Sequence, residues 1–351
     1  MIQTTLPLLE FSGKYLYIYA DIFFVKGFTR TMVCDLNRKK WFFIGNDYHD
    51  VILKFKSKKI EEVANEIGVE SIDQLMSFIA SFIENDFAEL VDDIKHFPSM
   101  KLEFDAPSLI TNAIIDIDEK RKMNFDKLSD ELDRLNCKFL QIRVYSEIEL
   151  CFLKDLIISF SSKDLYSIQF LLKYQNDIAV EDYLLLTEQF PMISITVHSA
   201  PFNKLYEAKL TAVMPALGFV YYIKQEITSC DACGIINREI MFVPEDIQVF
   251  IENITHNSCL NRKISVDING DIKHCPSMKE SYGNVSDVSL TDVAMKNEFQ
   301  ALWTINKDQI TGCQDCEYRY VCSDCRAYVV DGLKSKPAKC NYDPYAGIWN
   351  V

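Results

Sequence analysis

The chain has 351 residues, 48% of them hydrophobic, and its 37 basic and 51 acidic side chains give a formal net charge of −14. This length is enough for two or three domains, and the acidic balance argues against nucleic acid as the main partner, because phosphate binding needs a basic surface. No apolar run approaches the roughly 20 residues of a membrane span, and the first residues lack the basic start of a secretory signal, so we expect a cytoplasmic protein with no membrane partner.

The first hundred residues contain strand patterns followed by helix patterns. Short runs of β-branched and aromatic residues, separated by polar or glycine-containing turns, predict strands at 15–20, 22–25, 31–35 and 41–44. Apolar side chains at helical spacing then predict three helices, with buried positions at Val51, Ile52, Phe55, Ile60, Val63, Ile67, Ile72, Leu75, Ile79 and Phe82. Strands followed by three helices favour a small winged-helix-like module, which we place at residues 1–100.

Residues 105–250 alternate strand and helix patterns. Strands are predicted at 109–118, 139–144, 167–172, 193–197 and 219–223. Helices are predicted at 125–135, 148–158 and 180–190. Alternating units of this length imply a parallel sheet with crossover helices, and therefore an α/β fold. At the end of the first strand, Asp116, Asp118 and Glu119 could bind a cation through oxygen ligands, although a polar loop at the carboxyl end of a strand is the preferred interpretation.

The last third of the chain gathers nine of the twelve cysteines. They are Cys230, Cys233, Cys259, Cys275, Cys313, Cys316, Cys322, Cys325 and Cys340. Thiolates are soft metal ligands, and a Cys-x-x-Cys pair places two sulfurs on one metal through a tight turn. Upstream of the densest group, VDINGDIKHC predicts a hairpin that turns at Gly270 and carries Cys275 back toward Cys259. These cysteines predict a metal centre.

The number of thiols limits the kinds of site that they can form. A closed zinc site or an all-cysteine iron–sulfur cluster takes about four thiolates. The seven cysteines from Cys259 onward would need one more, from Cys230 or Cys233, to complete two such sites. A disulfide framework is the alternative, but a chain of 351 residues without a signal peptide argues against it. The remaining cysteines are interpreted as small buried hydrophobic side chains: Cys34, Cys137 and Cys151.

The spacing of these cysteines resembles the SPASM pattern of radical SAM enzymes that modify ribosomally made peptides. Ten residues separate Cys259 from Gly270, and four separate Gly270 from Cys275, as in the first half of that pattern. Cys313-x₂-Cys316-x₅-Cys322 matches its second half. The resemblance implies an outer [4Fe-4S] cluster on Cys313, Cys316, Cys322 and Cys340, and an inner one on Cys259, Cys275, Cys325 and either Cys230 or Cys233. One departure is that two residues separate Cys322 from Cys325, where the family usually has three.

The N-terminal module carries a second resemblance. Residues 24–44, which read FVKGFTRTMVCDLNRKKWFFI, are followed by three predicted helices and resemble the PqqD-like recognition element of peptide-modifying enzymes. The resemblance implies that an exposed strand edge captures the leader of a precursor peptide by accepting it as an additional strand. A structural wing with no peptide partner is the alternative.

The alternating region that precedes the SPASM-like cysteines resembles the partial (β/α) barrel of radical SAM enzymes. That family holds its SAM-binding cluster in a Cys-x-x-x-Cys-x-x-Cys loop after the first barrel strand. Here the corresponding stretch, IIDIDEKRKMNF, contains no cysteine, and no part of the chain matches the motif. We therefore expect a degenerate barrel without radical SAM activity.

Together these features resemble the SPASM-domain peptide maturases of grasp-with-spasm systems. The resemblance implies three domains, at 1–100, 105–250 and 251–351, and two partners, an ATP-grasp ligase and a precursor peptide. The expected function is that of an iron–sulfur maturation factor that binds the leader without cleaving SAM. Two alternatives stay open: a redox peptide-modifying enzyme that uses an auxiliary cluster, and a zinc-stabilised peptide-binding scaffold.

Overall fold

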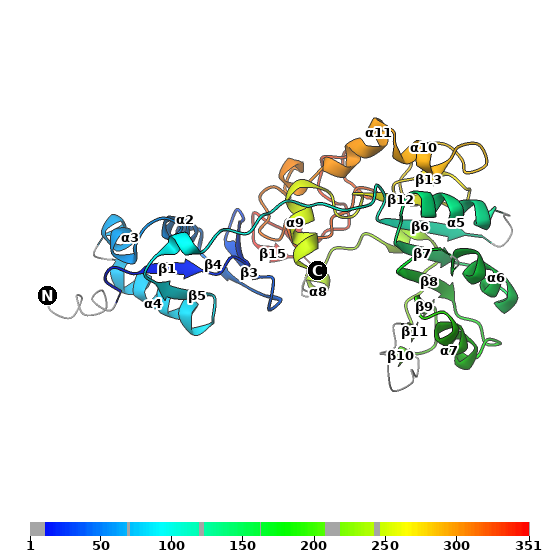
Figure 1. The fold of residues 1–351 in the computed structure, drawn as a ribbon, viewed down its shortest axis with the longest axis horizontal. Coiled ribbons are helices and arrows are strands. Elements are labelled where there is room, and N and C mark those ends of the chain that lie inside the picture. The colour runs from blue at the N-terminus through cyan, green and yellow to red at the C-terminus, as the bar shows by residue number, and fades with distance from the viewer. Residues whose placement is uncertain are drawn as a thin grey trace.

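In the described part of the chain, eight strands form one large and mostly parallel sheet (Figure 1). This computed structural model describes residues 11–68, 71–118, 123–161, 163–207, 218–241 and 246–350. The strands are β6 (Asn112–Ile117), β7 (Phe139–Val144), β8 (Ser167–Lys173), β9 (Ile193–His198), β10 (Lys204–Glu207), β11 (Phe219–Tyr222), β12 (Lys263–Val266) and β13 (Ile272–Lys273). Their order is β10-β11-β9-β8-β7-β6-β12-β13, with β10 and β13 antiparallel to their neighbours. The predicted α/β fold with a large parallel sheet is confirmed.

Three helices lie along one side of this sheet (Figure 1). They are α5 (Phe125–Arg134), α6 (Leu150–Ser161) and α7 (Val180–Gln189). Helix α5 begins at Asn124, whose side chain accepts a hydrogen bond from the Lys127 amide and so satisfies one of the free N–H groups of the first turn. The apolar faces of the helices join the buried strand residues in one core, as expected of a parallel sheet whose strands are nearly continuous hydrophobic runs.

The hairpin predicted around Gly270 lies at one edge of the sheet. β12 and β13 pair in antiparallel fashion, and Gly270 lies in the connecting turn with a φ of 77°, which glycine adopts at little cost. β12 also pairs in parallel with β6, so strands from both sides of residue 250 belong to one sheet. The hairpin places Cys275 in the same small cluster as Cys259, as predicted.

The N-terminal part contains two small sheets and three helices. β2 (Ile22–Lys26), β3 (Thr31–Asp35) and β4 (Lys40–Ile44) form an antiparallel sheet, and β1 (Tyr15–Ile18) pairs with β5 (Ala88–Val91). The helices are α2 (Asn46–Phe55), α3 (Ile60–Ile67) and α4 (Ile72–Glu84). Four strands and three helices agree with the sequence patterns. Strand β5 was not predicted from the sequence. Its sequence, AELV, has no run of β-branched residues, and its two middle residues, one acidic and one apolar, are both exposed.

Both faces of the β2–β3–β4 sheet are covered, because alternate strand residues point to opposite sides. Val33 faces the helices and shares a core with Phe82 of α4. Its neighbour Cys34 faces the other way and shares a core with Tyr318 of the cysteine-rich segment. All five residues of β3 are buried as a result. The N-terminal module therefore packs directly on the cysteine-rich segment.

An extended segment, residues 98–107, leads from the N-terminal part to the large sheet (Figure 1). The other helices are short: α8 (Arg238–Met241), α9 (Ile247–Thr255), α10 (Leu290–Ala294) and α11 (Asn297–Gln300). Single 3₁₀ turns occur at η2 (Ile94–His96), η3 (Cys230–Ala232), η4 (Ala301–Thr304) and η5 (Lys307–Gln309), and β14 (Tyr342–Asp343) pairs with β15 (Ile348–Trp349) near the end. Among the described residues, no helix has the length and apolar character needed to cross a membrane.

Candidate metal centre

The cysteine-rich segment has almost no regular secondary structure of its own. Between η5 and β14 the described residues form turns and bends, with isolated bridges between Val329 and Pro337 and between Cys340 and Ile236. Its cysteines are nevertheless sheltered, Cys325 being buried and the other four half-buried, and all twelve cysteines of the chain are free thiols. The disulfide framework considered from the sequence is therefore not present. A segment this irregular has few backbone ladders to stabilise it, so other cross-links, such as metal–thiolate bonds, would add to its stability.

One group of thiols gathers Cys313, Cys316, Cys322 and Cys340. The Cys316 amide donates a 3.0 Å hydrogen bond to the Cys313 carbonyl, which closes the tight turn expected of a Cys-x-x-Cys pair. Cys316, Cys322 and Cys340 also pack against the same buried cluster. Burial raises the pKa of Cys322 to about 11, and Cys340 adds to that rise. Burial likewise raises the pKa of Cys313 to about 12, with contributions from Cys322 and Cys340. We name these four residues the outer thiol group.

A second group gathers Cys233, Cys259, Cys275 and Cys325. Burial raises the pKa of Cys275 to about 11, and both Cys259 and Cys233 add to the rise. Burial also raises the pKa of Cys325, again with contributions from Cys259 and Cys233. The Cys233 loop lies close to Cys325, because a Cβ added to Gly234 would come within 2.9 Å of the Cys325 sulfur. We name these four residues the inner thiol group.

Cys233 and Cys230 contribute to different pKa shifts, because Cys233 adds to the rises of Cys275 and Cys325. Cys230 interacts with two tyrosines instead: burial raises the pKa of Tyr145 and of Tyr328, and Cys230 contributes to both rises. The loop that carries both cysteines is held by its carbonyl groups. Ser277 Oγ donates to the Cys230 carbonyl at 3.1 Å, and Lys339 Nζ donates to the Cys233 carbonyl at 2.9 Å. We therefore assign Cys233 to the inner thiol group and treat Cys230 as the ninth thiol.

The spacing of the thiols within each group bears on the kind of metal that they could bind. Among the described residues, no three side chains of His, Cys, Asp or Glu converge tightly enough to hold a single metal ion. Four thiolates around one zinc ion at about 2.3 Å would lie roughly 3.8 Å from one another. An iron–sulfur cluster takes each thiolate on a different iron, so its ligands are spaced more widely. The donor type and number suit either zinc sites or clusters, and metal analysis distinguishes the two.

A buried lysine gives independent evidence for negative charge beside the outer thiol group. Lys307 is 2% exposed, and its Nζ donates a 3.0 Å hydrogen bond to Asn253 Oδ1. No carboxylate of the described residues forms an ion pair with it. Burial raises the pKa of Cys322, and Lys307 opposes that rise most strongly. A buried ammonium needs a counter-charge. Glu252, whose pKa Lys307 acts to lower, and the outer thiol group as thiolates are both placed to supply it.

The carboxyl ends of β6 and β7 hold a buried ion pair next to the inner thiol group. Arg143 Nε and Nη2 donate to the two carboxylate oxygens of Asp116 at 2.6 and 2.9 Å, and the Tyr145 hydroxyl donates to the same carboxylate at 3.3 Å. Burial acts to lower the pKa of Arg143, but Asp116 and, more weakly, Cys275 raise it overall. Both oxygens of Asp116 thus have partners, which disfavours the cation site considered at this position. Glu119, the third member of that group, lies outside the described residues.

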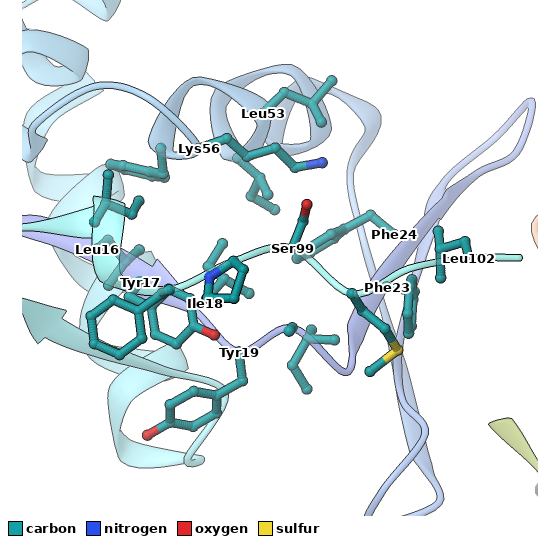
Figure 2. A pocket seen from close by; sticks show the side chains of 18 of the residues that line it. Leu16, Tyr17, Ile18, Tyr19, Phe23, Phe24, Leu53, Lys56, Ser99 and Leu102 are labelled. Carbon is teal, nitrogen blue, oxygen red and sulfur yellow. The ribbon is translucent and has the colours of Figure 1, made fainter.

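Two hollows border the N-terminal module. One, of about 770 Å³, lies between the module, residues 97–102 and α9, and its lining is mostly apolar (Figure 2). Figure 2 shows Leu53 and Lys56 on one side of it, Ile18 on the other, and the segment with Ser99 running through it. The second, of about 480 Å³, follows β4 and is lined by Lys39, Lys40, Trp41, Phe42, Ser81, Asn85 and Phe87. Residues 97–102 run through the first hollow. The second hollow, along β4, therefore borders the more accessible strand edge.

Comparisons with known proteins gave few matches. No protein-family model matches the sequence, and no curated protein matches it. Among solved structures, SuiB of Streptococcus suis bound to S-adenosylmethionine is similar at 11% identity and a TM-score of 0.36, over 93% of this chain and 100% of that chain. SuiB bound to the precursor peptide SuiA is similar at 10% identity and a TM-score of 0.34, over the same shares. Likenesses at these values carry no argument, so the function is argued from the residues of this chain.

Proposed function

We propose that this chain is an iron–sulfur maturation factor for a ribosomally made peptide. In this proposal it carries two [4Fe-4S] clusters, binds the leader of the precursor through its N-terminal module, and acts with an ATP-grasp ligase without cleaving SAM. The proposal is supported by the free thiols of the last third of the chain, eight of which fall into two sets whose members raise one another's pKa. The SPASM-like spacing implies the same division, which makes an accidental gathering of thiols a poor explanation.

The clusters would be held by the two thiol groups. The outer thiol group supplies four ligands around the buried ammonium of Lys307, and the inner thiol group supplies four beside Arg143. When bound, such clusters would supply one-electron transfer or a rigid anionic cross-link. The residues of the chain would bind the irons, exclude water by burial, and balance the cluster charge with Lys307 and Arg143.

The peptide would bind at the free edge of β4. Among the described residues β4 pairs with β3 alone, so its other edge can accept a further strand. The hollow beside this edge provides space for side chains of the added strand, and Lys39 and Lys40 provide positive charge. The opposite edge of the sheet is less suitable, because Arg319 Nη1 already donates to the Lys26 carbonyl of β2 at 2.7 Å.

Metal analysis of oxygen-free protein tests the cluster assignment. Replacing both Cys313 and Cys316 with Ala should remove the iron and sulfide of one cluster, since two of its four ligands are lost. Replacing the exposed Cys151 of α6 with Ala is the matched control, because that thiol lies outside both groups, and it should leave the iron content unchanged. Equal iron content in the double variant and the control would reject the outer ligand set.

The leader-binding part of the proposal needs a separate test on the full chain. A precursor peptide, fluorescently labelled at its leader, should bind the wild-type protein and lose affinity when Phe42 is replaced by Asp, which places charge in the hollow along β4. Leu53 lines the other hollow, so Leu53→Asp serves as the control and should bind normally. The reverse result would move the peptide to the hollow of Figure 2.

One observation favours a redox enzyme as the second candidate. Cys230 is a ninth thiol next to the inner thiol group, between Tyr145 and Tyr328, and it has no place in either set of four. A thiol in that position could exchange with a ligand or take part in a reaction at the inner cluster. A spectrum of the inner cluster that changes when substrate peptide is added, and does not change in Cys230→Ala, would favour this candidate.

A further inference from the structure

The hairpin loop between β2 and β3 is seated on the turn that carries the outer cysteines. The Phe28 amide donates a 2.8 Å hydrogen bond to the Asp315 carbonyl, between Cys313 and Cys316 in the sequence. From the opposite side, Arg319 Nη1 donates to the Lys26 carbonyl at 2.7 Å. The same Arg319 nitrogen also donates to the Cys316 carbonyl at 3.1 Å. These bonds join the N-terminal module to the backbone of the proposed ligand turn.

A buried ion pair reinforces this contact. Arg30 Nε donates to Glu317 Oε1 at 2.7 Å, and the Tyr342 hydroxyl donates to the same oxygen. Glu317 is 0% exposed, and its Oε2 has no hydrogen-bond partner among the described residues. A buried carboxylate depends strongly on its one counter-ion. Separation of Arg30 from Glu317 would leave this charge uncompensated unless the whole turn rearranged.

The fit between the two surfaces is close enough to require a glycine. A Cβ added to Gly27 would lie 2.8 Å from the Glu317 amide nitrogen and 2.9 Å from both Cβ and Oε2 of Glu317. Real Cβ atoms do not approach other heavy atoms this closely, so any side chain at Gly27 must push the hairpin away from the turn. By contrast, a Cβ at Gly45, which follows β4 at the same end of the sheet, would meet its nearest atom at 3.8 Å.

The docking surface has no secondary structure to fix its shape. Residues 313–325 contribute the Asp315 carbonyl, the Glu317 carboxylate and the Arg319 guanidinium, and each of these lies within three residues of an outer cysteine. Thiolate–metal bonds at Cys313, Cys316 and Cys322 would hold the turn in the conformation that the hairpin recognises. Without them the turn is held only by hydrogen bonds, such as those from the Cys316 amide to the Cys313 carbonyl and from Arg319 to Asp308, and by the packing of Tyr318 and Val321.

We infer that the hairpin loop of the N-terminal module docks on the outer cysteine turn only while that turn is ligated, so that loss of the outer metal releases the module. This inference rests on the proposed function, because it requires a metal on the outer thiol group. It goes further in assigning a regulatory role: the position of the peptide-binding module would report the state of the outer cluster. Oxidative loss of the cluster would then separate leader recognition from the rest of the molecule.

Thermodynamic coupling requires the effect to run in both directions. If metal binding favours docking, docking must favour metal binding by the same factor, which is typically about 5- to 150-fold for coupled sites. A variant that cannot dock, such as Gly27→Ala, should therefore bind the outer metal but lose it faster to a chelator. Gly45→Ala, which keeps both surfaces intact, should lose it at the wild-type rate.

The experiment uses the full chain, purified without oxygen, as wild type, Gly27→Ala, Arg30→Gln and Gly45→Ala. Iron is measured in every sample before and after a chelator. Hydrogen exchange at the Phe28 amide reports docking, exchange within α4 reports folding of the module, and protease cleavage within residues 98–107 reports its release. Metal removal from wild type should speed Phe28 exchange roughly tenfold or more and increase cleavage, while α4 stays protected. Gly27→Ala and Arg30→Gln should show fast Phe28 exchange even with iron bound, and faster iron loss.

Two outcomes would overturn the inference in distinguishable ways. Wild-type protein that binds iron, loses it to the chelator and keeps slow Phe28 exchange would refute the coupling and leave the proposed function standing. Protein that binds no iron at all would refute both. Because α4 lies in a core separate from the docking surface, a variant that fails to fold is recognised by loss of α4 protection. Arg30→Gln then decides the result if Gly27→Ala is such a variant.

Discussion

At the level of single residues, Lys307 has properties that depend on the state of the outer thiol group. Its ammonium is buried, with Asn253 as its hydrogen-bond partner, and Asn253 is itself fixed by a 3.1 Å bond to the Tyr320 carbonyl. In the metal-free protein a buried and unpaired charge costs several kcal/mol. In the loaded protein the anionic cluster compensates that charge. Lys307 should therefore destabilise the folded protein without metal and stabilise it with metal bound.

Replacing Lys307 with Met tests this change of sign. The substitution should raise the thermal unfolding temperature of metal-free protein and lower that of loaded protein. It should also shift the midpoint potential of the outer cluster to a more negative value, because a nearby positive charge is lost. Lys334 is exposed, so Lys334→Met is the control and should change neither quantity. A Lys307→Met effect of equal size and sign in both states would show that the ammonium does not sense the thiols.

His198, at the end of β9, makes stability depend on pH. It is 1% exposed, its Nε2 has no hydrogen-bond partner among the described residues, and burial lowers its pKa. In the unfolded chain the same group titrates near 6.5. As pH falls through that value the unfolded state takes up a proton that the folded state does not, so the free energy of unfolding falls, by at most about 1.4 kcal/mol per pH unit.

The variant His198→Gln should lose this dependence. Denaturant unfolding at pH 7.5 and 5.5 measures the effect, with the comparison made between the wild-type and variant differences, so that other titrating groups cancel. The wild type should lose more stability on acidification than the variant. Equal losses would mean that His198 is protonated in the folded protein.

At the level of elements, the β12–β13 hairpin connects the large sheet to the inner thiol group. Gly270 lies in its turn with a φ of 77°, and an added Cβ would meet the Asn284 side chain at 3.2 to 3.3 Å. Gly270→Ala should therefore cost about 1–2 kcal/mol of stability from the left-handed backbone and, in addition, should displace Cys275 and lower iron binding by the inner cluster.

A second glycine separates these two effects. Gly332 has a similar φ of 69° but nothing within 4 Å of an added Cβ. Gly332→Ala should show the backbone cost in thermal unfolding while leaving iron content unchanged. If both variants lose the same amount of iron, the hairpin does not control the position of Cys275.

Much of the fold could be predicted from sequence periodicity. Strand β7 has the predicted bounds, and α5 and β8 differ by one residue at their ends, because each is a strongly patterned segment in a buried parallel unit. Strand β5 could not be predicted, since a short half-exposed edge strand has too few apolar residues to show a period. The parallel pairing of β12 with β6 was missed too, because pairing across about 150 residues leaves no local pattern.

The candidate site was predicted in its residue types but not in its surroundings. The spacing of cysteines predicted two sets of ligands, and the contribution of Cys233 to the pKa rises of Cys275 and Cys325 supports assigning Cys233, rather than Cys230, to the inner one. Lys307 and Arg143 were missed, because a lysine or an arginine in a sequence gives no indication that folding will bury it. The three-dimensional arrangement is the only information that identifies such charge partners.

At the level of the whole molecule, the N-terminal module, the large sheet and the cysteine-rich segment are joined through the same region. The hairpin loop of the module contacts the outer cysteine turn, and the carboxyl ends of β6 and β7 adjoin the inner thiol group. In Figure 1 the cysteine-rich segment lies between the N-terminal module and the large sheet. Damage to either cluster should affect interactions on both sides of it.

The missing cysteine loop gives a prediction for the reaction of the complete protein with SAM. Residues 113–127, from within β6 into α5, contain no cysteine, so three thiolates cannot hold a SAM-binding cluster there. Reconstituted protein incubated with SAM and a strong reductant should form no 5′-deoxyadenosine above the level of a cluster-free control. Production at a rate that scales with protein and depends on iron would show that another set of thiols performs this chemistry.

The central claim is that the eight gathered thiols bind two iron–sulfur clusters, and its most direct test is the stoichiometry of metal in protein purified without oxygen. Two [4Fe-4S] clusters predict about eight irons and eight sulfides per chain, with little zinc. One or two zinc ions per chain with no sulfide, or a folded protein that contains neither metal, would contradict the account.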